Sequence, residues 1–195
     1  RYMGVMLVSF VGSPCSGKTT TAASVFAELK ANGLPAEFVS EHARLYIARA
    51  KLKAMQDKTE FALTDEDQRK ILVNQYEIEQ TMVRVCGPEV MVISDSCPLN
   101  SLLYINDTNV FVNPEAYFSE IASKLNLIFV CDPVKPLSSL DPNRIHDEEQ
   151  SKAIHEKIAP MLAKHAPNVK TVPLFGNNAV RVGTVLRHLY TGTFW

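Results

Sequence analysis

The chain has 195 residues, which is enough for one well-buried domain and too few for two comfortable ones. Apolar residues make up 46% of the chain and charged residues 21%, the proportions of an ordinary globular protein. With 20 basic and 21 acidic side chains the formal net charge is −1, which argues against nucleic-acid binding through a bulk basic field but does not exclude a local basic groove.

Membrane insertion is not expected. The longest apolar stretch, residues 5–11, is much shorter than the roughly 20 residues that a spanning helix requires. A signal peptide is not expected either, because no cleavable small-residue site precedes residue 12. The cysteines form no CxxC pair and have no metal-ligand spacing, so reduced thiols are expected at Cys15, Cys86, Cys97 and Cys131. We therefore expect a cytoplasmic protein without a membrane partner.

Strand-like and helix-like segments alternate along the chain, which predicts an α/β domain with a five-stranded, mainly parallel sheet flanked by helices. Thr64 precedes an acidic first turn, as a helix N-cap does, and Pro114 suits the first position of another helix. In chain order we predict a strand over 4–11, a helix over 18–31, a strand over 36–40, a helix from about 41, a long helix from 65 to before 87, a strand over 90–94, a helix from 114, a strand over 127–130, a helix over 146–166, a strand over 169–174 and a helix over 177–190.

Residues 12–19 match the phosphate-loop pattern GxxxxGK[ST] at every fixed position, between an apolar strand and a helix. Its glycines let backbone N–H groups converge on phosphate oxygens, and the following helix adds its positive N-terminal end. Lys18 is expected to reach the β- and γ-phosphates and Thr19 to ligate Mg²⁺. The pattern predicts a three-layer P-loop NTPase fold with ATP and Mg²⁺ as cofactors. The expected nucleotide contacts are Gly12, Ser13, Pro14, Cys15, Ser16, Gly17, Lys18, Thr19 and Thr20.

Asp95 directly follows the apolar strand over 90–94 and so occupies a position like that of the Walker B acid. An acid there can hold magnesium, directly or through water, beside Thr19. The alternative is an aspartate that only forms a turn after the strand. We expect Asp95 to be a catalytic and metal-binding residue close to the substrate.

Four segments, taken in order, resemble small P-loop kinases of nucleosides and nucleotides. The nearest likeness is to the kinase domain of bacterial nicotinamide riboside kinase and its relatives, many of them phage-encoded. The segments are the phosphate loop, 39–44 (VSEHAR), 93–96 (ISDS) and 141–144 (DPNR). Together they cover nearly the whole chain in order and spacing, and only the phosphate loop is specific by itself. Ser94 and Ser96 depart from the Asp-Thr pairing commoner in relatives, which leaves the role of Ser96 open.

The resemblance implies an acceptor-side role for Glu41, which follows the second strand. An acid at this position approaches the substrate hydroxyl and can accept its proton. The alternative is an acid that only favours the dipole of its own helix. Arg44, one turn further on, would bind a substrate phosphate or orient Glu41, or would form no more than a surface ion pair.

Two further roles follow from the same resemblance. Arg144, in a lid segment at about 133–150, would close over the transferring phosphoryl group, whose spread charge a guanidinium stabilises. The alternative for Arg144 is a surface pairing with Asp141 or Asp147. Asn177, at the start of the last helix, would border the adenine. Several aromatic side chains would stack on a base or nicotinamide ring, or serve only as packing: Tyr46, Tyr76, Tyr104, Phe111 and Tyr117.

The leading hypothesis is a single-domain kinase (1–195) that transfers the γ-phosphoryl group of ATP to a hydroxyl of a nucleoside- or nucleotide-like small molecule. A second places that hydroxyl on a modified base in DNA: the net charge argues against it, and the basic run 49–58 argues for it. A third is an ATPase switch, which normally needs sensor or finger arginines. The sequence leaves open the acceptor, the choice of ATP or GTP, and whether the protein is a homo-oligomer.

Overall fold

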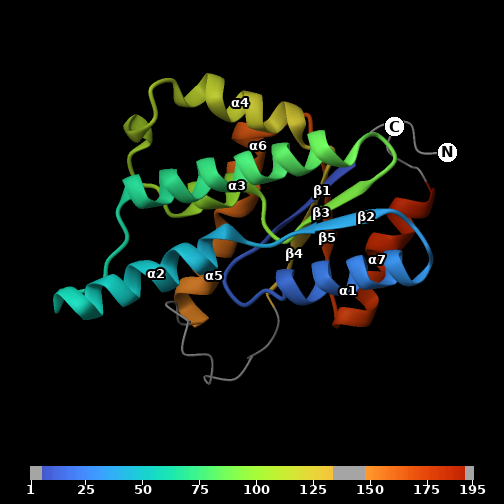
Figure 1. Ribbon diagram of the computed structural model, residues 1–195, viewed down its shortest axis with the longest axis horizontal. Coiled ribbons are helices and arrows are strands. Elements are labelled where there is room, and N and C mark those ends of the chain that lie inside the picture. Colours follow the sequence, from blue (N-terminus) through green and yellow to red (C-terminus); the bar gives the residue numbers. More distant parts are fainter. Residues whose placement is uncertain (1–5, 134–147, 192–195) are drawn as a thin grey trace.

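A computed structural model describes residues 6–133 and 148–191. Its strands form one sheet in the order β2-β3-β1-β4-β5, and every neighbouring pair is parallel (Figure 1). The strands are β1 (Met6–Val11), β2 (Ala36–Val39), β3 (Met91–Ser94), β4 (Leu127–Cys131) and β5 (Lys170–Leu174). The predicted parallel sheet is confirmed.

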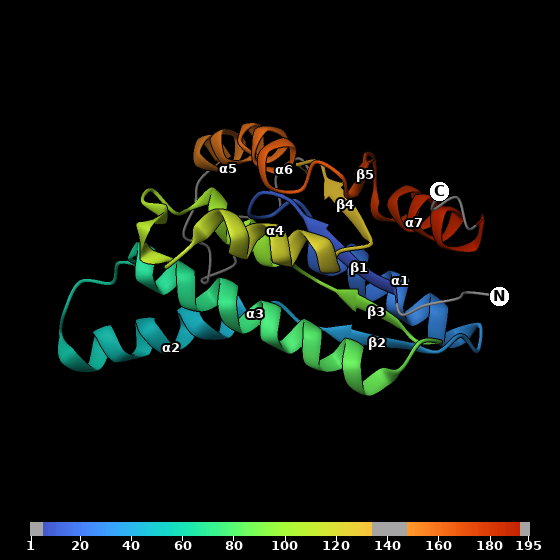
Figure 2. The same cartoon turned by 90° about the horizontal axis from the view of Figure 1, so that it is seen from above.

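Helices cover both faces of this sheet and make three layers (Figures 1 and 2). The helices are α1 (Lys18–Ala31), α2 (His42–Asp57), α3 (Asp65–Cys86), α4 (Pro114–Lys124), α5 (Glu148–Glu156), α6 (Ile158–His165) and α7 (Asn178–Thr191), with short 3₁₀ helices η1 (Pro98–Leu103) and η2 (Thr108–Val110). None of the helices within the described ranges combines the length and apolar character that crossing a bilayer requires.

Alternation along β1 explains the layering, since successive side chains of a strand point to opposite faces. Val8 and Phe10 belong to a core that includes α1 and α7, whereas Leu7 and Val11 belong to a second core that includes α3, α4, α6 and η1. Because both faces of β1 are buried, the segment reads as a continuous apolar run. The loop that leaves β1 is therefore held at the centre of the sheet.

Two predicted helix starts are confirmed in detail. Thr64 and Asp67 form a capping box at the start of α3, in which each side chain bonds the backbone N–H of the other residue. The Asn113 side chain accepts a hydrogen bond from Ala116 N at the start of α4. The 3₁₀ helices η1 and η2 were not predicted.

The prediction of one continuous helix over 146–166 is wrong. Two helices, α5 and α6, meet at Lys157, and residues 146–147 lie outside the described residues. The break has a local cause at Pro160, which has no N–H to donate to the carbonyl of Glu156. In the third position of α6 that missing donor costs nothing, because the first-turn N–H groups of a helix have no partner within the helix.

Candidate active site

The phosphate loop between β1 and α1 has a backbone that only small residues allow. A Cβ at Gly12 would clash with Ser16 Oγ and lie 3.0 Å from the carbonyl oxygen of Cys131. Gly17 has φ 83°, in the left-handed region that glycine adopts without strain, and Cys15 has φ 65°. The spacing of the motif therefore gives a tight turn, as the sequence predicts, and this turn lies against Cys131 at the end of β4.

Lys18 lies inside this loop with its side chain 8% exposed. Its Nζ donates to the carbonyl oxygens of Gly12 at 2.9 Å and Ser13 at 3.1 Å. Ser16 Oγ is buried without a partner among the described residues. A cation is thus fixed at the centre of a backbone ring at the N-terminus of α1, the arrangement that binds phosphate in P-loop proteins.

Two neighbours brace the loop from outside. Sequence reasoning placed Arg181 only in the segment expected near the adenine, and it did not single out Ser151. Arg181 of α7, 2% exposed, donates to the carbonyl oxygens of Ser16 at 2.5 Å, Asp132 at 2.8 Å and Gly176 at 2.9 Å. Ser151 of α5 donates to Pro14 O at 2.8 Å. An arginine in a late amphipathic helix carries no signal of such a role, because its partners are backbone atoms distant in sequence.

Asp95 is brought beside Thr19, as the Walker B position predicts. It is 2% exposed, its N–H donates to Val39 O at 2.9 Å, and Oδ1 has no partner within the described part of the chain. Burial and the nearby charge of Glu41 raise the pKa of Asp95. A hydrogen bond from Thr19 and the charge of Lys18 lower this pKa and offset part of the rise. A buried carboxylate with an unpartnered oxygen beside a hydroxyl fits the oxygen ligands that Mg²⁺ prefers.

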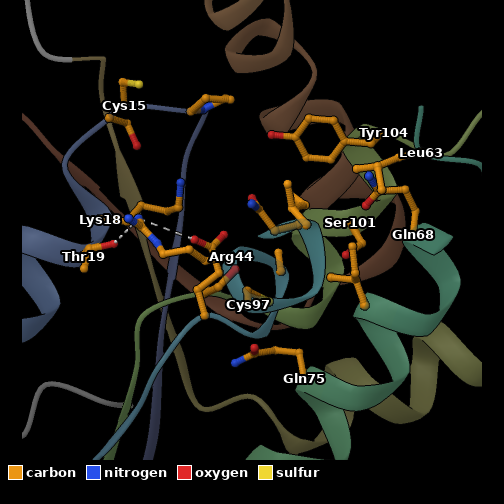
Figure 3. Close-up of a pocket in the computed structure, with 18 of the residues that line it drawn as sticks. Cys15, Lys18, Thr19, Arg44, Leu63, Gln68, Gln75, Cys97, Ser101 and Tyr104 are labelled. Atoms are coloured by element: carbon orange, nitrogen blue, oxygen red, sulfur yellow. Dashed lines mark hydrogen bonds and ion pairs between the residues drawn. The ribbon is translucent and has the colours of Figure 1, made fainter. Parts of the chain in front are cut away.

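A cavity of about 670 Å³ lies beside the loop (Figure 3). Lys18, Thr19 and Cys15 form one side in Figure 3, and Tyr104, Gln68 and Ser101 form the other. The far wall comes from α2, α3, η1 and the segment before α3. Its residues are Ile47, Ala48, Phe61, Ala62, Leu63, Gln68, Ile71, Gln75, Ser96, Cys97, Pro98, Asn100, Ser101 and Tyr104.

Glu41 and Arg44 lie together at this cavity. Glu41 is the N-cap of α2, but its carboxylate makes no capping bond. Arg44 Nη2 lies 4.0 Å from Glu41 Oε2 and 3.5 Å from Thr19 Oγ1. The Arg44 side chain is 60% exposed, so the ion pair is weakly stabilising. The two side chains stand between the phosphate loop and the far wall.

Two predicted site residues are not placed at the phosphate loop, beside Thr19 or at the cavity. Asn177 is exposed, and its side chain accepts a hydrogen bond from Val180 N at 3.0 Å, which caps α7. Arg144 lies outside the described residues, as does most of the predicted lid at 133–150. The adenine role of Asn177 and the lid role of Arg144 stay predictions from the sequence.

Of the five aromatic residues singled out in the sequence, only Tyr104 lines the cavity in the described structure. Tyr46 and Tyr76 instead donate to Asp67 at 2.6 Å and Glu120 at 3.0 Å. Phe111 and Tyr117 pack against Phe118. The polar wall residues Gln68, Gln75 and Asn100 were missed by sequence reasoning, since a glutamine in an amphipathic helix has no pattern that separates a site from a surface.

The sheet order, the phosphate loop between β1 and α1, and the acid after β3 define a P-loop nucleotide-binding protein of the NTPase class. The family model described as an AAA domain matches residues 7–179, and the chain belongs to this family. Among curated proteins, none matches the chain in sequence.

Several solved structures have the same fold as this chain. NadR protein in complex with NR has a TM-score of 0.67 and 19% identity, over 97% of this chain and 52% of that chain. NadR protein with NAD and AMP-PNP has a TM-score of 0.64 and 20% identity, over 97% and 50%. Thymidylate kinase from Candida albicans has a TM-score of 0.60 and 13% identity, over 100% and 95%.

The chain thus spans about half the length of the NadR chains that it resembles. The deoxyadenosine kinase from M. mycoides with bound dCTP is similar over 95% of this chain and all of that one, with a TM-score of 0.58 and 10% identity. These likenesses establish the fold, and a fold by itself hosts many activities.

Proposed function

We propose that the protein is a kinase that transfers the γ-phosphoryl group of ATP to a hydroxyl of a nucleoside- or nucleotide-like acceptor. The cavity carries this proposal, because one continuous space has the phosphate loop on one side and Glu41 with a largely neutral wall on the other. Its volume of about 670 Å³ lies in the range of small-molecule sites. A P-loop protein that only hydrolyses its nucleotide needs no such second compartment.

On the donor side, the loop backbone and Lys18 would hold the triphosphate, and ATP would sit with its γ-phosphate at the cavity. Thr19 and Asp95 would hold Mg²⁺, which supplies charge neutralisation between the phosphates when bound. In the described ranges, no group of three or more His, Cys, Asp or Glu side chains could hold a metal. A pair such as Thr19 and Asp95 suits Mg²⁺, which usually takes its other ligands from phosphate and water.

On the acceptor side, Glu41 would take the proton of the acceptor hydroxyl. The hydroxyl oxygen forms a bond to the γ-phosphorus while the bond from that phosphorus to the β,γ-bridging oxygen breaks, and ADP leaves. The Glu41 carboxylate makes no capping bond in α2, and its ion pair with Arg44 is long at 4.0 Å, so its oxygens can accept a proton from the acceptor. Lys18 and Arg44 would balance the charge on the transferring group.

The far wall indicates the chemistry of the acceptor. All fourteen of its residues are uncharged, and they combine apolar side chains with amides and hydroxyls. Tyr104 offers an aromatic face for stacking, and Gln68 and Asn100 offer hydrogen bonds. Such a wall favours a flat, uncharged ring with polar edges, as in a nucleoside.

The experiment is an ATP turnover assay with a panel of acceptors: nicotinamide riboside, thymidine, deoxyadenosine and thymidylate. We expect one or more of them to raise ADP release and to appear as a phosphate ester. ADP release that no acceptor changes, with inorganic phosphate as the only other product, would instead support the ATPase switch.

A second candidate acceptor is a hydroxyl on a modified base in DNA, and helix α2 favours it. In the part of the chain that the structure describes, no residue of α2 is buried, and the helix extends from the cavity with Arg44, Arg49, Lys51 and Lys53 along it (Figure 2). A single-stranded oligonucleotide with a 5-hydroxymethylpyrimidine belongs in the panel. Binding that weakens steeply with salt, together with labelling of the oligonucleotide, would favour this acceptor.

A further inference from the structure

Three buried polar side chains form a network that reaches the cavity at Gln75, one of its wall residues. Gln75 and Glu79 of α3 are 3% and 0% exposed, and Ser94 at the end of β3 is 0% exposed. Ser94 Oγ lies 2.5 Å from Glu79 Oε1 and 3.2 Å from Gln75 Nε2, and Gln75 Nε2 lies 3.4 Å from Glu79 Oε1. Figure 3 shows Gln75 at the bottom of the view, below Cys97. None of these groups has a role in the phosphoryl transfer described above.

The surroundings of Gln75 fix which way its amide faces. Oε1 accepts the N–H of His42 at 2.8 Å, and Nε2 faces the oxygens of Glu79 and Ser94. The reversed amide would point an NH₂ group at an N–H donor and a carbonyl at a carboxyl oxygen. Only the observed orientation satisfies both sides, so Glu79 and Ser94 determine what Gln75 offers to His42.

Hydrogen counting at Ser94 indicates the protonation state of Glu79. The Ser94 hydroxyl has one hydrogen, but its oxygen lies 2.5 Å from Glu79 Oε1 and 2.7 Å from the carbonyl oxygen of Ser96. A carbonyl can only accept, so Ser94 donates to Ser96, and the short contact to Glu79 needs a proton from the Glu79 carboxyl group. Ser94 then accepts from Glu79 and Gln75 and donates once, which fills the capacity of a hydroxyl.

The two ends of this network lie at the two acids of the site. The His42 N–H that Gln75 binds belongs to the peptide bond between Glu41 and His42, at the first turn of α2. At the other end, the bond from Ser94 to the Ser96 carbonyl spans Asp95, whose own N–H is held by Val39. One buried network therefore fixes the backbone on which both Glu41 and Asp95 are carried.

We propose that Gln75 is a positioning residue that holds the Glu41 peptide for attack on the acceptor hydroxyl, and that a protonated Glu79 keeps the Gln75 amide in the required orientation. This inference rests on the proposed function for its catalytic part and on hydrogen bonds alone for its structural part. Burial also raises the pKa of Glu79 to about 8. The titratable group that faces it is the buried thiol of Cys97, and no charged side chain contributes to the shift among the described residues.

The test compares Gln75→Met, which keeps the volume but removes all three hydrogen bonds of the side chain, with Glu79→Gln, which mimics a neutral acid. Amide exchange of His42 is followed by NMR in the protein alone. Transfer from ATP is measured with whichever of nicotinamide riboside, thymidine, deoxyadenosine or thymidylate the wild-type protein phosphorylates. Circular dichroism checks that each variant is folded.

In Gln75→Met we expect His42 to exchange about tenfold faster, since its N–H loses its acceptor. We expect kcat to fall by roughly 10- to 100-fold, as small misplacement of a reacting group does, with the KM for ATP unchanged. Glu79→Gln should keep the His42 exchange and kcat of the wild type within about threefold, because its amide can still donate to Ser94.

Unchanged His42 exchange in a folded Gln75→Met variant would overturn the structural part. Faster exchange with unchanged kcat would overturn the positioning role. Loss of kcat in Glu79→Gln would show that a charged carboxylate is needed and overturn the protonated state. Should Gln75→Met fail to fold, Gln75→Leu takes its place, since it also lacks the acceptor for His42 and the donor to Ser94, and the same two readouts decide. Absence of any transfer by the wild type contradicts the proposed function. The amide exchange of His42 needs no substrate, so it still tests whether the hydrogen-bond network holds the Glu41 peptide.

Discussion

The two sides of the cavity are built in different ways. The donor side comes from one short segment, residues 12–19, and acts through backbone N–H groups and one lysine. The acceptor side is assembled from α2, α3, η1 and the segment before α3, which are far apart in sequence, and acts through side chains. A site for a phosphate can therefore be a local property of the chain, whereas a site for an organic ring needs the tertiary fold.

The donor side is most sharply tested by Lys18→Ala. Removal of the ammonium group leaves the loop without its central cation, so we expect phosphoryl transfer to fall by about 10³-fold. Because Nζ bonds only two loop carbonyls, circular dichroism should show a folded protein. Near-normal transfer in a folded variant would contradict the assignment of the phosphate loop.

On the acceptor side, Glu41→Gln should impair phosphoryl transfer without impairing nucleotide binding. The amide cannot take a proton, so we expect kcat to fall by about 10²-fold. Affinity for Mg²⁺ and AMP-PNP, measured by calorimetry, should change little because Glu41 stands outside the loop. An equal loss of nucleotide binding would remove Glu41 from the role of acceptor base.

Tyr104→Ala probes the far wall, with Tyr46→Ala as a matched tyrosine on α2 that does not line the cavity. Loss of one aromatic face should raise the KM for the acceptor by about tenfold, with the KM for ATP unchanged. Steady-state kinetics with both substrates varied would measure this. Equal effects of the two substitutions would show that Tyr104 has no specific contact with the acceptor.

A separate prediction concerns the pH dependence of stability at Glu79. Its pKa is about 8 in the folded protein and 4.5 in the unfolded chain, so the folded state holds one more proton between these values. The free energy of unfolding should therefore fall as pH rises from 4.5 to 8, by up to about 1.4 kcal/mol per pH unit from this group. Urea titrations should show that Glu79→Gln lacks this component, and an identical pH profile in both proteins would contradict it.

The contrast between the two sides also explains how much the sequence could predict. The sheet, the phosphate loop and the position of Asp95 follow from apolar runs and short motifs, and the structure bears out the strands. Gln75 and Tyr104 could not be assigned, because their partners lie in other elements and no local pattern marks them. Pro160 shows the same limit within one segment. The apolar periodicity of residues 146–166 continues without interruption, although the missing N–H of Pro160 allows the helix to break between α5 and α6.

The most direct measurement is ³¹P NMR of the protein with ATP, Mg²⁺ and the nucleoside panel. Our account predicts that the γ-phosphate of ATP appears as a phosphate monoester of one nucleoside, in equal amount with ADP, and that Lys18→Ala and Glu41→Gln each suppress this signal. ADP together with inorganic phosphate alone, in the presence of every acceptor, would contradict a shared cavity for donor and acceptor.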